Sequence, residues 1–248
     1  MEVDQILLLT LLIAFGGGIV AAVAGFGFSL VAAPPLLLMY APAEVTALLL
    51  IVAFVTRWML LLDTWRTTHT RTVAAMLPAA YVGIGAGIVI VRTVDPDYIK
   101  LLASLVVVVA AVLLMRGWHP RRAHAPTAAP VTGLLSGMLS PTTGMDGTPV
   151  VFLLSSRDYP IADFRSTITV YYYLILPVTI LALMQQGLLG RDDVIRSLLV
   201  APAVVGGTFI GQRIVRRMSI ERFRKVVYGL LLISGLVGAV AAALSLMS

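Results

Sequence analysis

Long apolar stretches alternate with short polar stretches along almost the whole chain. Several of the apolar stretches reach the approximately 20 residues that a helix needs to cross a bilayer. The pattern predicts eight apolar segments, at Ile6–Tyr40, Val45–Leu62, Val73–Val91, Ile99–Met115, Val131–Ser155, Ile168–Leu183, Val194–Val215 and Val226–Leu246. We therefore expect an all-α polytopic membrane protein.

The two halves of the chain resemble each other. A shift of 124 residues places Pro78, Gly83, Gly87 and Arg92 on Pro202, Gly207, Gly211 and Arg216. A shift of 119 residues places Gly25 on Gly144. Each match alone is also explained by close helix packing, but the shared register predicts two homologous four-segment repeats. The expected repeats are residues 1–116 and 131–248, joined by the proline-rich linker 117–130.

The first segment of each half contains helix-breaking residues at presumed membrane depth. Ser140–Pro149 combines prolines and glycines with hydroxyl side chains and one carboxylate, and Gly25–Ser29 precedes Pro34 and Pro35. Lipid offers no hydrogen bonds, so an interrupted backbone persists there only where protein or a water-filled cavity satisfies its N–H and C=O groups. Paired breaks, one in each half, are typical of the substrate site of a transporter.

Composition agrees with a membrane protein and changes the meaning of the positive charge. The chain is 59% hydrophobic and 12% charged, against about 25% charged residues in soluble domains. The net charge of +6 does not indicate a nucleic-acid partner, because the basic residues lie in short loops, as the positive-inside rule expects. The chain contains no cysteine, which excludes disulfides and thiolate metal sites.

The distribution of loop charges favours one topology. If all eight segments crossed the membrane, lysine and arginine would divide almost evenly between the two sides. If the first and fifth segments return to the side from which they enter, one side keeps only Arg92, Lys100, Arg191 and Arg196. This second arrangement agrees better with the positive-inside rule. It predicts inverted repeats, each with a broken or re-entrant first helix, in the inner (plasma) membrane with both termini outside the cytoplasm.

The residues at and after the breaks resemble a known family. Gly133–Gly137, Thr143–Pro149 and Phe164–Ile168 resemble second-half motifs of the sulfite exporter TauE/SafE family, and Ala24–Pro34 is similar to its opening motif. The resemblance covers nearly the whole chain. It implies an exporter or permease of small sulfur-containing anions, such as sulfite or organosulfonates. Asp146 and Thr148 depart from the family pattern, which usually has Gly and Pro at these positions.

The chemistry of the breaks predicts an anion site. Sulfite and sulfonates present three acceptor oxygens, and helix N-termini offer unpaired N–H donors and a favourable dipole end. Hydroxyl groups and arginine add further donors. The expected substrate-binding residues are Gly25, Gly27, Ser29, Arg57, Thr143, Gly144, Gly147, Thr148 and Arg165. The alternatives are tight packing for the glycines and an interfacial position for the two arginines.

Other polar residues have more ordinary interpretations. Asp146 is the one carboxylate clearly inside an apolar segment, and we expect it to carry a coupling proton. Ligation of Na⁺ and capping of backbone N–H groups are the alternatives. One hydroxyl of Tyr171–Tyr173 is expected either to line the path or to pack at the membrane interface. His69, His119 and His124 lie in basic loops without metal-ligand spacing, and we expect solvated side chains and no cofactor.

The motifs exclude the main enzyme classes. The chain has no serine–histidine pair, zinc-protease motif or P-loop, so neither a membrane protease nor an ATP-driven pump has its residues. The predicted function is a secondary transporter of small sulfur oxyanions or organosulfonates. A passive anion channel and a cation permease that uses Asp146 remain the alternatives. The expected partners are the anion and the lipid bilayer, and the oligomeric state, including a homodimer, stays open.

Overall fold

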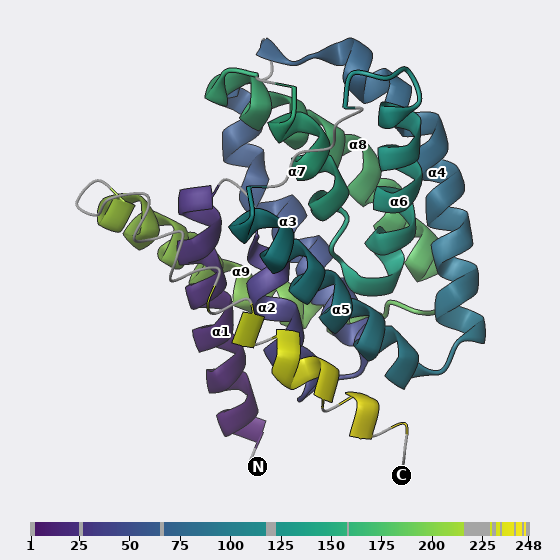
Figure 1. Cartoon of the computed structure of the whole chain (residues 1–248). Helices are drawn as coiled ribbons and strands as arrows, with labels where there is room; N and C mark the ends of the chain where they lie inside the picture. Colours follow the sequence, from purple (N-terminus) through teal and green to yellow (C-terminus); the bar gives the residue numbers. More distant parts are fainter. Residues whose placement is uncertain are drawn as a thin grey trace.

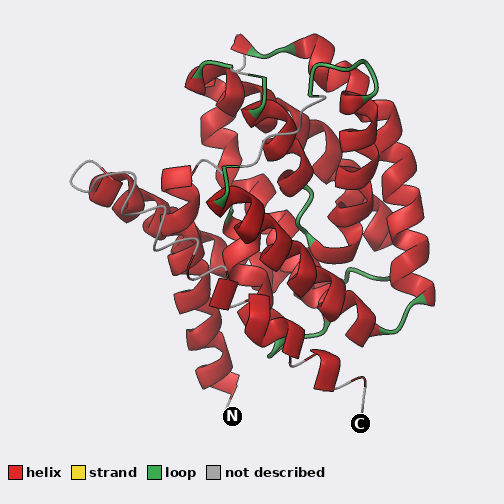
Figure 2. Ribbon diagram, viewed as in Figure 1, coloured by secondary structure: helices red, strands yellow, loops and turns green. Residues whose placement is uncertain are grey.

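A computed structural model describes residues 3–24, 27–64, 67–117, 123–157 and 159–215, and helical residues 229, 232–233, 235–240, 242–244 and 246. This part of the chain is almost entirely helical and contains no strand (Figure 2), which confirms the all-α prediction. Its helices up to residue 215 are α1 (Val3–Ala24), α2 (Phe28–Leu37), α3 (Pro42–Thr64), α4 (Thr70–Thr93), α5 (Pro96–Met115), α6 (Ala128–Thr143), α7 (Gly147–Ser155), α8 (Ile161–Gln185) and α9 (Arg191–Val215).

Apolar helices long enough to cross a membrane make up much of the molecule. Among the described residues, five stretches have this length and composition: Gln5–Ala22, Thr70–Thr93, Pro96–Met115, Ala162–Gln185 and Arg191–Gly211. Large apolar side chains on several of them point away from the protein, and Leu8, Val82 and Leu199 are each more than half exposed. Lipid, and not water, is the solvent in which such surfaces are stable.

The chain reverses direction between α1 and α2 and again between α6 and α7. The hydroxyl groups of Thr10 in α1 and Tyr40, just after α2, are 2.8 Å apart. The Arg157 Nε, just after α7, donates to the main-chain oxygen of Ala123, just before α6, at 3.0 Å. The end of α2 therefore lies close to the first turns of α1, and the end of α7 lies close to the beginning of α6 (Figure 1).

These two helix pairs open toward opposite ends of the molecule. Tyr40 lies just after α2, and the guanidinium carbon of Arg196 in α9 is 5.2 Å from the centroid of its ring. Arg196 in turn forms an ion pair with Glu44 at the start of α3, at 3.0 Å. The end of α7 instead contacts the start of α4, where Arg157 Nη1 donates to Thr72 Oγ1 at 2.8 Å. Figure 1 shows α1 beginning at the lower end of the view and α6 descending from the upper end.

Helix α3 crosses the interior between two buried apolar clusters. Leu49 and Val52 pack in a cluster with residues of α1, α2, α5 and α9. Leu50 and Ile51 pack in a second cluster with residues of α4, α7 and α8. Because successive helical residues point about 100° apart, both sides of α3 are covered. This central position brings Arg57, near the end of α3, into the interior.

Glycine permits two close helix crossings. At the crossing of α4 and α6, a Cβ atom at any of three glycines would overlap a backbone oxygen of the other helix: Gly83 with Leu134, Gly133 with Met76, and Gly137 with Ala80. At the crossing of α1 and α9, the same holds for Gly18 with Val204, Gly207 with Phe15, and Gly211 with Ile19. Small residues allow such backbone approach in membrane helices, where dispersion contacts and not the hydrophobic effect hold helices together.

Candidate functional site

A small cavity lies where α2 and α7 begin. Its volume is ≈ 20 Å³, enough for about one water-sized group. Four structural elements and the turn before α7 contribute its lining, which consists of Gly27, Phe28, Ser29 and Leu30 at the start of α2, Met145, Gly147 and Thr148 at the start of α7, Arg57 of α3 and Tyr172 of α8. The cavity therefore joins the polar residues of the first and second halves.

The backbone at the cavity leaves amide groups without helical partners. Gly27 has a φ of 99° and stands at the N-cap of α2, and Gly144 has a φ of 64° and ends α6. Glycine adopts such positive φ angles without a Cβ penalty. Neither α2 nor α7 has a side chain that caps its N-terminus by a hydrogen bond. Because the first N–H groups of a helix have no partner within it, α2 offers donors and a positive dipole end near the cavity. At α7 the Thr148 amide already donates to the Met145 oxygen at 3.1 Å and Pro149 has no N–H, so the beginning of α7 contributes chiefly its positive dipole end.

Arg57 is the cation that lines the cavity. Its guanidinium lies over the ring of Tyr172, 3.8 Å from the centroid. Nη1 is buried and has no hydrogen-bond partner within the protein. A buried cationic donor in this condition is costly unless a ligand or water supplies an acceptor.

Tyr172 contacts both Arg57 and the beginning of α7. The side chain is 5% exposed, and a Cβ atom at Gly147 would overlap its hydroxyl oxygen. The neighbouring tyrosines point elsewhere, because Tyr171 donates to Ser136 Oγ at 2.8 Å and Tyr173 donates to the Phe54 carbonyl at 3.1 Å. Of the three consecutive tyrosines, Tyr172 is the one at the cavity.

Asp146 stands at the N-cap of α7 without using its carboxylate as a cap. The residue is 3% exposed, and its Oδ2 atom has no hydrogen-bond partner. Its main-chain oxygen accepts a hydrogen bond from Ser136 Oγ at 2.7 Å, and Ser136 accepts one from Tyr171. The main chain of this turn is thus held by side chains of α6 and α8, whereas the Oδ2 atom of the carboxylate remains available.

Apart from Arg165, the predicted site residues separate into three groups. Gly27, Ser29, Arg57, Gly147 and Thr148 line the cavity. Thr143, Gly144 and Asp146 belong to the turn between α6 and α7, where Thr143 Oγ1 accepts from Met145 N at 3.3 Å and Gly144 packs against Leu49. Gly25 lies outside the described residues. The lining residues Phe28, Leu30 and Met145 are apolar, and nothing in the sequence distinguishes them from other apolar residues of their segments.

Arg165 occupies a different part of α8 from the cavity lining. It lies seven residues before Tyr172, which corresponds to two helical turns and about 10 Å along the axis. Asp163, two residues before Arg165, pairs with His69, with 3.1 Å between Oδ2 and Nε2. Arg165 is therefore nearer to the N-terminal end of α8, on the side of the molecule where α6 begins and α7 ends.

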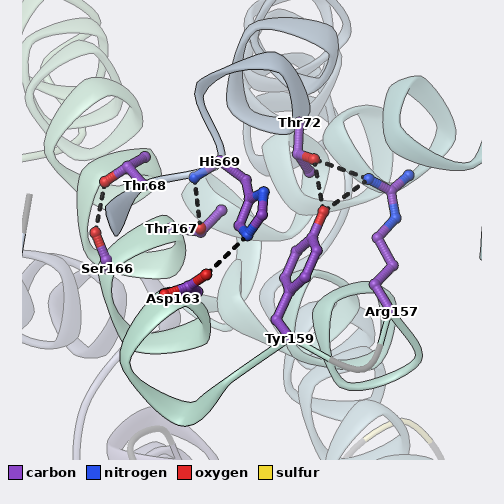
Figure 3. Close-up of polar contacts among 8 residues, drawn as sticks. All are labelled: Thr68, His69, Thr72, Arg157, Tyr159, Asp163, Ser166 and Thr167. Carbon is purple, nitrogen blue, oxygen red and sulfur yellow. Dashed lines mark hydrogen bonds and ion pairs between the residues drawn. The ribbon is translucent and has the colours of Figure 1, made fainter. Parts of the chain in front are cut away.

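A second polar cluster joins this end of α8 to the start of α4 (Figure 3). The His69 amide donates to Thr167 Oγ1 at 3.1 Å, and the His69 ring stacks on Tyr159 with 3.9 Å between centroids. The Thr68 and Ser166 hydroxyls are 2.5 Å apart. His69 is therefore engaged with neighbouring side chains and is not the simple solvated residue that we expected. The cluster links the segment before α4 to the first turns of α8, which are far apart in the sequence.

The helices, the apolar surface and the polar cavity at two helix N-termini together define an integral membrane protein of the transporter class. Comparison with known proteins identifies the group within that class. The chain belongs to the sulfite exporter TauE/SafE family, whose model matches residues 10–238. Members of this family are membrane transporters and not enzymes. No curated protein and no solved structure matches the chain significantly.

Proposed function

We propose that the protein is a secondary transporter that exports small sulfur-containing anions, such as sulfite or organosulfonates, across the inner membrane. The observation that carries this proposal is the convergence of two helix N-termini and of Arg57, whose Nη1 atom is buried and unpaired, on a single cavity. Amide N–H groups bind anion oxygens and the guanidinium neutralises charge with fixed, planar donors. An anion with three acceptor oxygens matches this set of donors, and it would enter when the cavity, which now holds about one water-sized group, widens.

Each lining residue has a distinct proposed role. Gly27 and Gly147 let the substrate approach the backbone, and Ser29 and Thr148 add hydroxyl donors. Arg57 binds the anion directly. Arg165 attracts anions toward the site from two turns away on α8. Thr143 and Gly144 shape the turn between α6 and α7, and Gly25 is the proposed counterpart of Gly144 in the first half.

The arrangement of helices supports inverted repeats over residues 1–116 and 131–248. Adding 124 to the residue numbers of α4 and subtracting 119 from those of α6 converts the contact of Gly83 with Leu134 into that of Gly207 with Phe15. The same shifts convert the contact of Gly137 with Ala80 into that of Gly18 with Val204. Each half thus packs its first helix on a later helix of the other half. In this proposal the linker 117–130 ends within α6, which begins at Ala128.

Inverted repeats suggest how the anion crosses the membrane. The α1–α2 and α6–α7 pairs open at opposite ends of the molecule and meet at the cavity. A change in the relative position of the two halves would open the cavity first to one side and then to the other, as in other transporters with inverted repeats. Asp146, buried in the turn before α7, is the proposed carrier of a coupling proton.

Transport by purified protein in liposomes tests this proposal. We expect flux of sulfite or methanesulfonate against its own gradient when a proton gradient is imposed, whereas a passive channel dissipates gradients only. Arg57→Ala should abolish anion binding and flux, and Arg57→Lys should weaken binding by about 1.5–3 kcal/mol because the planar donors are lost. Arg165→Lys should retain binding, because Arg165 does not line the cavity.

Arg191→Ala provides the matched control, since Arg191 is exposed at the start of α9. Every variant is checked for monodisperse elution before assay. Unchanged binding and flux in well-folded Arg57→Ala would rule out the proposed site. Absence of anion flux in the wild-type protein under all gradients would rule out the function itself.

A further inference from the structure

Two oppositely charged residues of the proposed site each have a buried atom without a partner. Within the described residues, Arg57 Nη1 and Asp146 Oδ2 are the buried side-chain nitrogen and oxygen atoms that lack a hydrogen bond. The two residues act on each other electrostatically but do not hydrogen-bond through these atoms. Asp146 immediately precedes the cavity-lining Gly147, and Arg57 lines the same cavity.

The surroundings of Asp146 leave one oxygen of its carboxylate, Oδ2, without a hydrogen-bond partner. Ser136 and Tyr171 form a hydrogen-bonded chain that ends on the main-chain oxygen of Asp146, not on its side chain. Oδ2 also makes no capping bond to α7, although a carboxylate oxygen of an aspartate at this position commonly does. Buried polar groups in folded proteins are almost always paired. An unpaired nitrogen of the cavity-lining Arg57 and an unpaired carboxylate oxygen of the residue next to the cavity-lining Gly147 therefore point to a ligand that pairs with both.

The chemistry of these two atoms restricts that ligand. Arg57 has only donors and requires an acceptor, whereas an ionised carboxylate has only acceptors and requires a donor. A fully ionised oxyanion would satisfy Arg57 but would place further negative charge and no donor beside Asp146. An oxyanion that also carries an O–H or N–H group would satisfy both.

We propose that the site selects oxyanions that carry their own hydrogen-bond donor, with Asp146 as the residue that determines this specificity. The anion oxygens bind Arg57 and the N-termini of α2 and α7, and the O–H or N–H group donates to Asp146 Oδ2. Hydrogen sulfite and an aminosulfonate share this chemistry, whereas methanesulfonate and sulfate dianion do not. The inference rests on the proposed function, because it assigns a substrate class to the same site.

Binding to the purified full-length protein, measured by calorimetry, tests the selection. Methanesulfonate and aminomethanesulfonate carry the same sulfonate group, but only the latter has an ammonium donor. We expect aminomethanesulfonate to bind at least about tenfold more tightly, the effect of one hydrogen bond to a charged group. In the pH range in which Asp146 stays ionised, sulfite should bind more tightly as the pH falls and hydrogen sulfite accumulates. The pH series with sulfite tests an O–H donor, and the comparison of the two sulfonates tests an N–H donor.

Asp146→Asn should reduce the preference for aminomethanesulfonate over methanesulfonate to less than about threefold, because the asparagine amide can donate to an anion that lacks a donor. Asp163→Asn is the matched control, since Asp163 pairs with His69 in the separate cluster of Figure 3, and it should keep the wild-type preference. If Asp146→Asn does not fold, the comparison of probes on the wild-type protein decides. Equal binding of the two sulfonates would overturn the selectivity while leaving the anion site standing. Failure of every anion to bind would instead overturn the proposed function.

Discussion

At the scale of single residues, the site depends on three groups in contact: the backbone at Gly147, the Tyr172 side chain and the Arg57 guanidinium. The beginning of α7 contacts the Tyr172 hydroxyl, and the Tyr172 ring supports the Arg57 guanidinium. Tyr172 therefore transmits the position of the backbone at Gly147 to the cation in the cavity. The contact leaves no space for a side chain at Gly147.

Gly147→Ala is expected to weaken anion binding and to inhibit transport. The new methyl group would overlap the Tyr172 hydroxyl, which is buried and cannot move without shifting its ring away from Arg57. Overpacking of this kind costs about 1–3 kcal/mol. Calorimetric anion binding and flux in liposomes measure the effect. Gly85→Ala on α4 is the control, because no neighbouring atom lies within 4 Å of its Cβ position. Wild-type binding in Gly147→Ala would show that the three groups are not coupled.

At the scale of secondary-structure elements, the two glycine crossings determine how the halves hold together. Helix α4 packs along α6, and α9 packs along α1, with backbone atoms in direct contact at each crossing. These contacts involve carbonyl oxygens of the opposing helix, which can move only if the whole helix moves. The two crossings should therefore respond to substitution in the same way.

Gly137→Ala and Gly18→Ala should each lower the stability of the folded protein, by about 1–3 kcal/mol, through separation of the crossing helices. A Cβ atom at Gly137 would overlap the Ala80 oxygen, and one at Gly18 would overlap the Val204 oxygen. Thermal unfolding in detergent measures the change. Gly16→Ala lies on the same helix as Gly18 but meets nothing within 4 Å, so it should not destabilise the protein. A large effect at one crossing and none at the other would argue against equivalent crossings.

At the scale of the whole molecule, the direction of the two helix pairs defines a topology. The α1–α2 pair and the start of α3 lie at one end, together with the start of α9. The α6–α7 pair opens at the end where α4 and α8 begin. The positive-inside rule predicts that the second of these ends faces the cytoplasm.

Single cysteines test this topology directly, because the natural chain has none. Ser155→Cys at the end of α7 should react with a membrane-impermeant thiol reagent from the cytoplasmic face. Thr93→Cys and Gln185→Cys, at the ends of α4 and α8, should react from the opposite face. Right-side-out and inverted vesicles provide the comparison, and all three side chains are exposed. Labelling of Ser155→Cys and Thr93→Cys from one face would exclude the inverted arrangement.

Local signals in the sequence accounted for the helical class, the family and the positions of polar backbone. Apolar length predicts membrane helices because each must satisfy its own backbone hydrogen bonds in lipid. Gly144 and the nearby prolines are recognisable because their backbone preferences are properties of single residues. Residue type and position along the chain were also sufficient to identify five residues that line the cavity: Gly27, Ser29, Arg57, Gly147 and Thr148.

The sequence by itself determined which segments are helical and where the polar breaks occur, whereas only the tertiary structure decided which side chains meet. Arg57 and Arg165 have equal charge and were both expected to bind the anion, yet only Arg57 lines the cavity. Tyr172 differs from Tyr171 and Tyr173 only by a rotation about α8, and His69 finds Asp163 94 residues away. Residue type and position are properties of the sequence. The direction in which a side chain points depends on how the helices rotate and cross, and packing between distant segments determines both.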